Sequence, residues 1–333
     1  MKNVKLSVLD LVAVGEGFTA GEAIHNSVHL AQKAEELGYE RYWFAEHHNS
    51  ASIASSATVL LIGKIAEHTK IIRVGSGGIM LPNHKPLIVA EQFGTLDAMY
   101  PGRIDLGVGR APGTDPTTAE ALGRSAYGAP NHFPEDVEQL QTYLGANEGA
   151  RVHAFPGENS NVPIYILGSS LFSAELAAQM GLPYAFASHF APNYLEQALQ
   201  LYRTQFKPSK YLDKPYTIAC VNGMAADTNE EAERMVTSLY QYFLGIVKGS
   251  PKKLMPAVDS MKEIWTMNER YAVLEALRYT FKGGPEKVKN QLQSFLQITQ
   301  VDEIMVTSHI YEPAERVHSY EILMQALKEL QEN

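Results

Sequence analysis

Residues 4–44 of the chain read VKLSVLDLVAVGEGFTAGEAIHNSVHLAQKAEELGYERYWF, and this stretch contains the repeating unit of the predicted fold. Residues 4–9 and 41–44 are short runs of mostly apolar side chains, which are typical of buried strands. Between them, residues 23–37 have apolar side chains at helical spacing and are followed by Gly38, a residue that commonly ends helices. The stretch therefore predicts a strand, a helix and a second strand.

The same alternation of strand-like and helix-like segments continues along the chain. Parallel strands need crossover helices between them, so the alternation predicts a parallel sheet. About eight such units fit a closed (β/α)8 TIM barrel, and an open doubly wound sheet is the alternative with the same pattern. The further strand candidates are residues 71–75, 104–108, 164–167, 184–187, 216–223 and 303–306, and the further helix candidates are residues 55–68, 86–99, 170–180, 194–206 and 313–330.

Two segments are longer than ordinary loops. Residues 109–162 are rich in Gly, Pro and Asn, and residues 231–280 have a helical pattern that is interrupted at 249–251. They follow the fourth and seventh predicted strands, where long insertions commonly form lids or interfaces. Because no linker or low-complexity tract divides the chain, we expect residues 1–333 to form a single TIM-barrel domain with insertions after strands 4 and 7.

The composition is that of a globular protein and weighs against several classes of partner. Of 333 residues, 45% are hydrophobic and 20% are charged, and the net charge of −9 argues against binding to nucleic acid or to a membrane surface. Cys220 is the only cysteine, which excludes an intrachain disulfide and suits a cytoplasmic location. Residues 1–14 fit a first strand better than a signal peptide, and residues 176–195 are too polar to cross a membrane.

In a barrel, residues that carry chemistry lie where the strands end. The second predicted strand runs into Glu46, His47 and His48, a cluster suited to acid–base catalysis because histidine titrates near neutral pH. Adjacent residues of a strand point to opposite sides, so His47 and His48 are poorly placed to bind one metal ion together. The cluster predicts a catalytic role without a metal, and a purely structural role is the alternative.

Glycine-rich segments lie at the ends of the third and fourth predicted strands. The run at residues 75–78, which includes Gly77 and Gly78, indicates either a flat ligand lying against bare backbone or a bulge in the barrel. Residues 107–113 lack the glycine spacing of a dinucleotide-binding motif. Arg110 leaves this strand and is suited to bind an anion such as phosphate, although an ordinary surface arginine would look the same.

The fifth predicted strand runs into Gly168, Ser169 and Ser170, and a helix then passes through Ser173. Small residues at a helix N-terminus leave backbone N–H groups free to bind phosphate, and either serine could also simply cap the helix. After the sixth predicted strand, His189 either faces the pocket or packs within its own loop.

Taken in order, these motifs resemble those of the bacterial-luciferase-like flavin-dependent monooxygenases over nearly the whole chain. No single motif is specific, and the resemblance rests on their order and spacing. The segments that carry it are residues 43–48, 74–84, 96–103, 107–110 and 163–170.

The resemblance implies a TIM barrel that binds FMN, usually as reduced flavin supplied by a separate flavin reductase. It implies that reduced FMN reacts with O2 to give a C4a-(hydro)peroxyflavin, which oxygenates a small organic substrate. It also implies a mobile segment within residues 240–282 and a homodimer formed through the early helices.

By motif position, His47 resembles the catalytic histidine of the family, and we expect Glu46 or His48 to orient it. Arg110, Ser170 and Ser173 resemble its phosphate contacts. The glycine pair falls where the family has a cis peptide bond beside the flavin, and His189 is our candidate for a substrate contact. The full set expected to contact the cofactor is Gly77, Gly78, Arg110, Gly168, Ser169, Ser170 and Ser173.

The chain departs from the light-emitting members of the family at three places. Those members have a cysteine at Gly109, an acidic residue at Ser169 and a tryptophan near His189, which weighs against luminescence and a long-chain aldehyde substrate. Three other functions stay open: an oxidoreductase of the same superfamily that uses the deazaflavin F420, a non-catalytic flavin-binding protein, and a metal-dependent barrel hydrolase.

Overall fold

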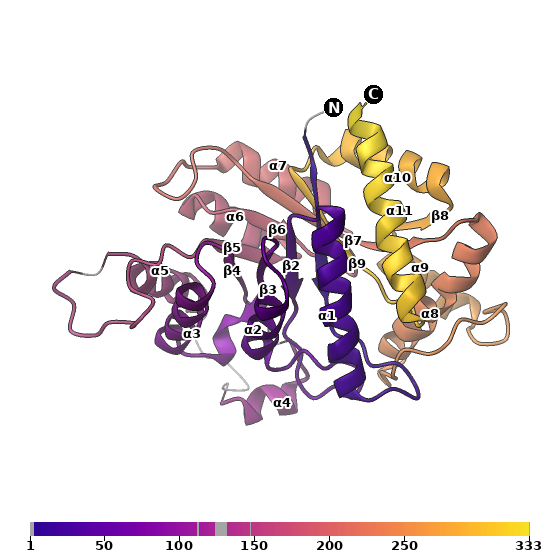
Figure 1. Ribbon diagram of the computed structural model, residues 1–333, viewed down its shortest axis with the longest axis horizontal. Helices are drawn as coiled ribbons and strands as arrows, with labels where there is room; N and C mark the ends of the chain where they lie inside the picture. The colour runs from indigo at the N-terminus through magenta and orange to yellow at the C-terminus, as the bar shows by residue number, and fades with distance from the viewer. Residues whose placement is uncertain (1–2, 112, 124–131, 147, 333) are drawn as a thin grey trace.

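The computed structural model describes residues 3–111, 113–123, 132–146 and 148–332. Its centre is a closed barrel of eight parallel strands surrounded by helices (Figure 1). The barrel is closed because β9 pairs with both β1 and β7, and β6 pairs with β7, so the predicted (β/α)8 barrel is confirmed. The strands are β1 (Lys5–Asp10), β2 (Arg41–Phe44), β3 (Arg73–Met80), β4 (Ile104–Gly109), β5 (Ile164–Gly168), β6 (Tyr184–Phe186), β7 (Thr217–Ala225), β8 (Thr280–Gly283) and β9 (Glu303–Thr307).

α1, α8 and α9 begin at a threonine that forms a capping box with a glutamate three residues later. In α1, Thr19 and Glu22 form a reciprocal capping box, and Gly38 ends the helix with a φ of 92°. α1 and α11 lie side by side on the barrel (Figure 1). The helices are α1 (Ala20–Leu37), α2 (Thr58–His68), α3 (Pro86–Met99), α4 (Pro116–Ala121), α5 (Phe133–Leu144), α6 (Leu171–Met180), α7 (Leu195–Gln205), α8 (Asn229–Val247), α9 (Met267–Ala276), α10 (Pro285–Thr299) and α11 (Pro313–Glu332), with a short 3-10 turn η1 (Leu81–Asn83).

Among the described residues, no helix has the length and apolarity that spanning a lipid bilayer requires.

The insertions follow β4 and β7, as predicted, and they lie toward opposite ends of the molecule (Figure 1). The segment after β7 contains α8, α9 and the short strand β8, which pairs with the carboxyl half of β7. The sequence patterns did not predict β8. The third strand was also placed wrongly: it was predicted to end at Gly75, but β3 continues through the glycine run to Met80.

The barrel interior has an ionic layer at its amino end and an apolar layer above it. The Arg41 guanidinium donates to Asp105 Oδ2 at 2.7 Å and to Glu303 Oε1 at 2.8 Å, and all three side chains are buried. Since these residues lie at the start of their strands, the ion pairs close the amino end. The layer above contains Leu9, Trp43, Ala45, Tyr165, Ala185, Ile218, Cys220 and Met305. The polar residues considered below therefore lie at the opposite, carboxyl end.

Candidate active site

The residues that the sequence singled out gather around the carboxyl mouth of the barrel. Parallel strands place all their carboxyl ends at one edge, so motifs far apart in sequence meet there. These residues come from five strand ends. Glu46, His47 and His48 follow β2, Gly77 and Gly78 lie in β3, Arg110 follows β4, Gly168 ends β5, Ser169 and Ser170 lead into α6, Ser173 lies in its first turn, and His189 follows β6.

Glu46 is buried and connects the end of β2 to the segment after β3. Its Oε1 accepts hydrogen bonds from His48 Nε2 at 2.7 Å and from His84 Nε2 at 2.9 Å, and its Oε2 accepts one from the Met80 N–H at 3.0 Å. Burial raises the pKa of Glu46, but the bonds from His84, His48 and Met80 outweigh it and leave the pKa below its ordinary value. Glu46 is therefore an ionised anchor for two histidines.

His47 is half-buried between these anchored residues. Burial lowers its pKa, and the hydrogen bond to the Gly113 backbone and the charge of Glu46 only partly oppose that effect. Its imidazole is therefore mostly neutral at pH 7 and able to accept a proton. The described hydrogen bonds of Glu46 run to His48 and His84, so the expected orientation of His47 by Glu46 or His48 stays a prediction.

Two further histidines, His189 and His309, are buried and lack the partners that buried polar atoms normally have. Among the described residues, Nδ1 of His189 and both ring nitrogens of His309 have no hydrogen-bond partner. Burial is the main cause that lowers the pKa of His189 to about 3 and that of His309 to about 4. His309 also stacks on Tyr242 of α8, with ring centres 4.9 Å apart.

His47, His189 and His309 follow the carboxyl ends of β2, β6 and β9. Repulsion from His309 and His47 contributes to the lowered pKa of His189. Buried nitrogen atoms without protein partners are expected to bond with a water molecule or with a ligand. The mouth therefore has the character of a site that receives a ligand.

The glycine pair in β3 forms bare backbone inside the mouth. The Gly77–Gly78 peptide bond is cis, which confirms what the resemblance implied. A Cβ atom on Gly77 would lie 2.8 Å from Leu9 Cδ1 and 3.2 Å from Trp43 Cβ, and one on Gly78 would lie 2.7 Å from the Gly107 oxygen. Gly77 is packed against the barrel interior and Gly78 against β4, so only glycine fits at either position.

On the β4–β5 side, a cation lies beside an open helix start. The exposed Arg110 has its guanidinium carbon 4.3 Å from the centre of the Phe172 ring, in the first turn of α6. Ser170 is the N-cap residue of α6, but its side chain makes no capping hydrogen bond. The first backbone N–H groups of α6 are thus left to bind an anion, next to a positive charge.

Gly168 and Ser173 set how closely α6 approaches β5. Ser173 is buried, and its hydroxyl donates to the Ser170 carbonyl at 2.8 Å. A Cβ atom on Gly168 would overlap the Ser173 side chain. The structure thus gives both residues a packing role, and the predicted contact of Ser173 with phosphate stays a prediction.

Sequence reasoning missed His84, His309 and Tyr242. His84 lies in the glycine-rich motif of residues 74–84, and its distance of 38 residues from Glu46 hid their contact. No pattern around His309 marks it as functional. Among the part of the chain that the structure describes, no group of three or more His, Cys, Asp or Glu side chains is placed to hold a metal ion.

A parallel barrel with neutral imidazoles and an anion-binding helix start at its carboxyl mouth has the features of a barrel enzyme. The family model described as luciferase-like monooxygenase matches residues 4–303. The luciferase-like monooxygenase of Escherichia coli (strain K12) is 49% identical over 330 residues, which cover 99% of this chain and 98% of that protein. The chain therefore belongs to the luciferase-like monooxygenase family and is an enzyme of that family.

One other similar protein has a named activity, and another has a solved crystal structure. The N-acetyl-S-alkylcysteine monooxygenase of Bacillus subtilis (strain 168) is 32% identical over 332 residues, which cover 97% of this chain and 98% of that protein. The crystal structure of apo-MsnO8 matches with a TM-score of 0.88 and 35% identity, and the match covers 98% of this chain and 99% of that one.

Solved structures at lower identity hold two kinds of cofactor. The oxygenating constituent of 3,6-diketocamphane monooxygenase from Pseudomonas putida, in complex with FMN, matches with a TM-score of 0.70 at 16% identity over 97% of each chain. An F420-dependent secondary alcohol dehydrogenase matches with a TM-score of 0.71 at 16% identity over 98% of this chain and 99% of that one. At this identity the likeness shows the fold alone, and the fold accommodates either cofactor.

Proposed function

We propose that the chain is an FMN-dependent monooxygenase that uses reduced flavin and O2 to oxygenate a small organic substrate. The observation that carries the proposal is the pairing of an anion-binding end with a flat backbone surface at the same mouth. Arg110 and the start of α6 suit a phosphate group, and Gly77–Gly78 suits a flat ring. FMN has both parts in one molecule.

The cofactor would be held by charge at one end and by shape at the other. The Arg110 guanidinium and the N–H groups at Ser169 and Ser170 would neutralise and bond the phosphate. Gly77 and Gly78 would present backbone without side chains to the ring. Bound in its reduced form, FMN supplies the activation of O2.

The histidines would manage protons around the reacting centre. His47 is mostly neutral at pH 7 and can take or hold one proton, while Glu46 fixes the position of the adjacent His48. His189 and His309 have ring nitrogens free for hydrogen bonds with the substrate. His189 would thus contact the substrate, and His309 extends that contact surface toward α8.

Water must be kept away from the reacting centre, and the insertion after β7 supports that role. α8 places Tyr242 against His309, and an apolar cluster that includes Leu239 and Phe243 packs behind it. We propose that part of residues 240–282 closes over the mouth when the ligands are bound.

The proposed partners are the organic substrate, O2 and a flavin reductase that delivers reduced FMN transiently. A homodimer through the early helices is supported by large apolar side chains exposed on α2 and α3, where Leu60 is 74% and Met99 is 55% exposed. The single cysteine, Cys220, suits a cytoplasmic location.

The test is an anaerobic titration of the chain with reduced FMN and, separately, with reduced F420, followed by mixing with O2. We expect saturable binding of reduced FMN at least tenfold tighter than that of F420. N-acetyl-S-alkylcysteines are the first substrates to test, because a relative is named for them. Mass spectrometry with labelled O2 should find one labelled oxygen in the product, and preferential binding of F420 without oxygen uptake would contradict the proposal.

A further inference from the structure

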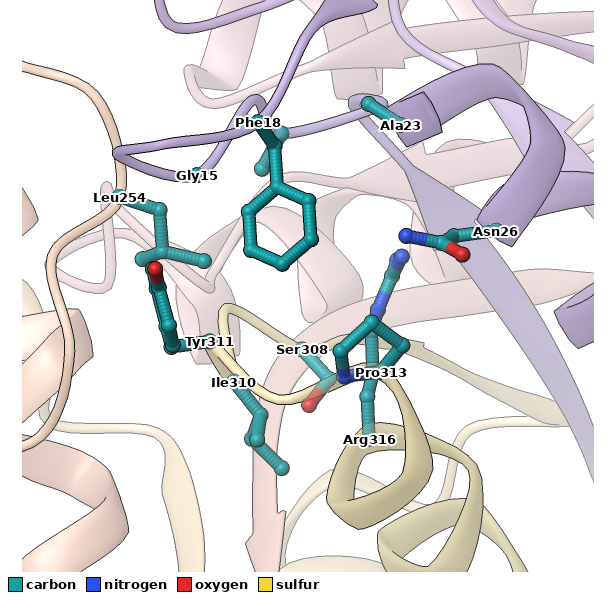
Figure 2. Close-up of a pocket in the computed structure, with 11 residues that line it drawn as sticks. Gly15, Phe18, Ala23, Asn26, Leu254, Ser308, Ile310, Tyr311, Pro313 and Arg316 are labelled. Carbon is teal, nitrogen blue, oxygen red and sulfur yellow. The ribbon is translucent and has the colours of Figure 1, made fainter. Parts of the chain in front are cut away.

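A second pocket, separate from the mouth, lies on the outer rim of the barrel between its first and last strands (Figure 2). It is a hollow open to solvent, and the empty space between its walls, counted out into the solvent, is about 440 Å³. We call it the rim pocket. Its walls come from the loop after β1, the start of α1, the loop after β9 and the first turn of α11, with Leu254 closing one side.

One wall of the rim pocket is apolar and aromatic. The rings of Phe18 and Tyr311 meet edge to face, with centres 5.6 Å apart, and Ile310 and Leu254 continue the surface. The Tyr311 hydroxyl is used within the protein, donating to the Glu16 carbonyl at 2.6 Å. This wall can therefore pack against an apolar or aromatic body but offers it few polar contacts.

The opposite wall holds a buried cation. Arg316 is only 13% exposed at its side chain, and its Nη2 donates to Asp10 Oδ1 at 2.8 Å. The Tyr320 hydroxyl also lies near the guanidinium. The Nε–H group is nevertheless buried without a partner among the described residues, which costs free energy unless an acceptor binds there.

The carboxylate of Asp10 accepts hydrogen bonds from several groups besides Arg316. Its Oδ1 also accepts the Val12 N–H at 2.8 Å, and its Oδ2 accepts the hydroxyls of Ser27 and Tyr42 at 2.5 Å each. Asp10 is therefore satisfied from several sides, and Arg316 keeps donors to spare for a ligand.

A second donor faces the same space. Figure 2 shows the side-chain amide of Asn26 with its nitrogen turned toward the Arg316 guanidinium. Asn26 makes no side-chain hydrogen bond with the residues that the structure describes, and two donor groups cannot satisfy each other. An oxygen placed between them would accept from both. Pro313 brings the positive end of α11 to the same corner.

We propose that the rim pocket binds a small organic carboxylate, with its carboxylate held between Arg316 and Asn26 and its apolar body against Phe18 and Tyr311. A carboxylate matches two converging donors, and an aromatic or aliphatic body matches the opposite wall. This site shares no lining residue with the proposed cofactor site at the mouth.

The rim pocket is placed to influence the mouth. Ser308 and Ile310 line it, and His309 between them belongs to the mouth. The charge of Arg316 helps to lower the pKa of His309, while Asp10 opposes that effect. An anion bound at Arg316 would therefore offset part of the positive charge that acts on His309.

The test uses 4-fluorobenzoate as the probe and follows its fluorine NMR signal as the full chain is added without flavin. We expect saturable binding at least tenfold tighter than that of the neutral 4-fluorobenzamide or of inorganic phosphate. Equal binding of the amide would mean that no anion is recognised, and equal competition by phosphate would mean that the apolar wall contributes nothing. Either result overturns the proposal.

Variants then locate the bound probe. Asn26→Leu removes one donor without disturbing the Asp10–Arg316 pair, and it should weaken binding at least tenfold, whereas Asn290→Leu on the exposed side of α10 should change it less than twofold. Arg316→Gln should weaken binding of the probe more than Asn26→Leu does. Arg110→Gln should leave it unchanged. Binding that survives Asn26→Leu, or that is lost in Arg110→Gln, places the probe elsewhere and refutes the assignment.

Discussion

At the scale of single residues, the account depends on histidines that are buried and neutral. A histidine whose pKa is lowered by folding binds fewer protons in the native state than in the unfolded state. Stability then falls as the pH drops below the ordinary value of about 6.5 and continues to fall toward the native pKa. His189 and His309, with values of about 3 and about 4, both act in this direction.

The first prediction concerns His309. Between pH 7.5 and 5.5, each of the two buried histidines should lower the free energy of unfolding by about 1.3 kcal/mol. His309→Gln should remove about that amount from the pH dependence measured by urea denaturation. The exposed His25→Gln on α1 is the control and should keep the wild-type slope. A slope that is unchanged in His309→Gln would show that His309 already titrates normally in the native state.

The second prediction concerns His47. His47→Ala should leave the affinity for reduced FMN within about threefold, because the phosphate and ring contacts lie elsewhere. Turnover with O2 and a substrate should fall by about 10²–10⁴, as expected for a lost proton-transfer group. The exposed His29→Ala serves as the matched control. Normal turnover in His47→Ala would remove this residue from the mechanism.

The third prediction concerns Arg110. Arg110→Gln should weaken FMN binding by about 10- to 100-fold, which corresponds to the loss of one charge-assisted contact. Equilibrium titration with FMN measures the effect, and the same titration with riboflavin, which has no phosphate, should show little difference. Arg151→Gln, at an exposed position after α5, is the control. If both flavins lose affinity equally, Arg110 does not contact the phosphate.

At the scale of elements, the site depends on how closely α6 packs against the end of β5. Gly168→Ala places a Cβ where Ser173 now lies, so α6 must shift. We expect a loss of about 1–3 kcal/mol in stability from overpacking, together with weaker FMN binding because the helix start moves. Gly21→Ala in the first turn of α1, where the nearest atom is 3.8 Å from the added Cβ, should cost nothing. Chemical denaturation and FMN titration of both variants measure the difference.

Elements with a clear boundary signal were predictable from sequence, and those without one were not. α3 begins at Pro86 and ends at Met99 as predicted, because a first-turn proline marks its start. β8 has only four residues and no repeat, so it was missed. The glycines of β3 indicated the end of a strand because glycine is disfavoured in strands, whereas here the packed interior excludes any side chain.

At the scale of the whole molecule, barrel closure creates the site. His47, His189 and His309 follow different strands, and the pairing of β9 with β1 and β7 places those strand ends at one mouth. The repeated strand–helix unit predicted the barrel, and the barrel predicted which strand ends to inspect. The repeated unit could not predict which side chains have hydrogen-bond partners, because this depends on packing between distant segments. The contact of Glu46 with His84 and the unpartnered ring nitrogens of His309 are examples.

The central claim is that one mouth holds FMN with its phosphate at Arg110 and the start of α6 and its ring against Gly77–Gly78. A crystal structure of the chain with FMN tests this most directly. We predict phosphate oxygens within hydrogen-bonding distance of Arg110 and the N–H groups at the start of α6, with the ring facing His47. An empty mouth, or a phosphate bound in the rim pocket beside Arg316, would contradict the account.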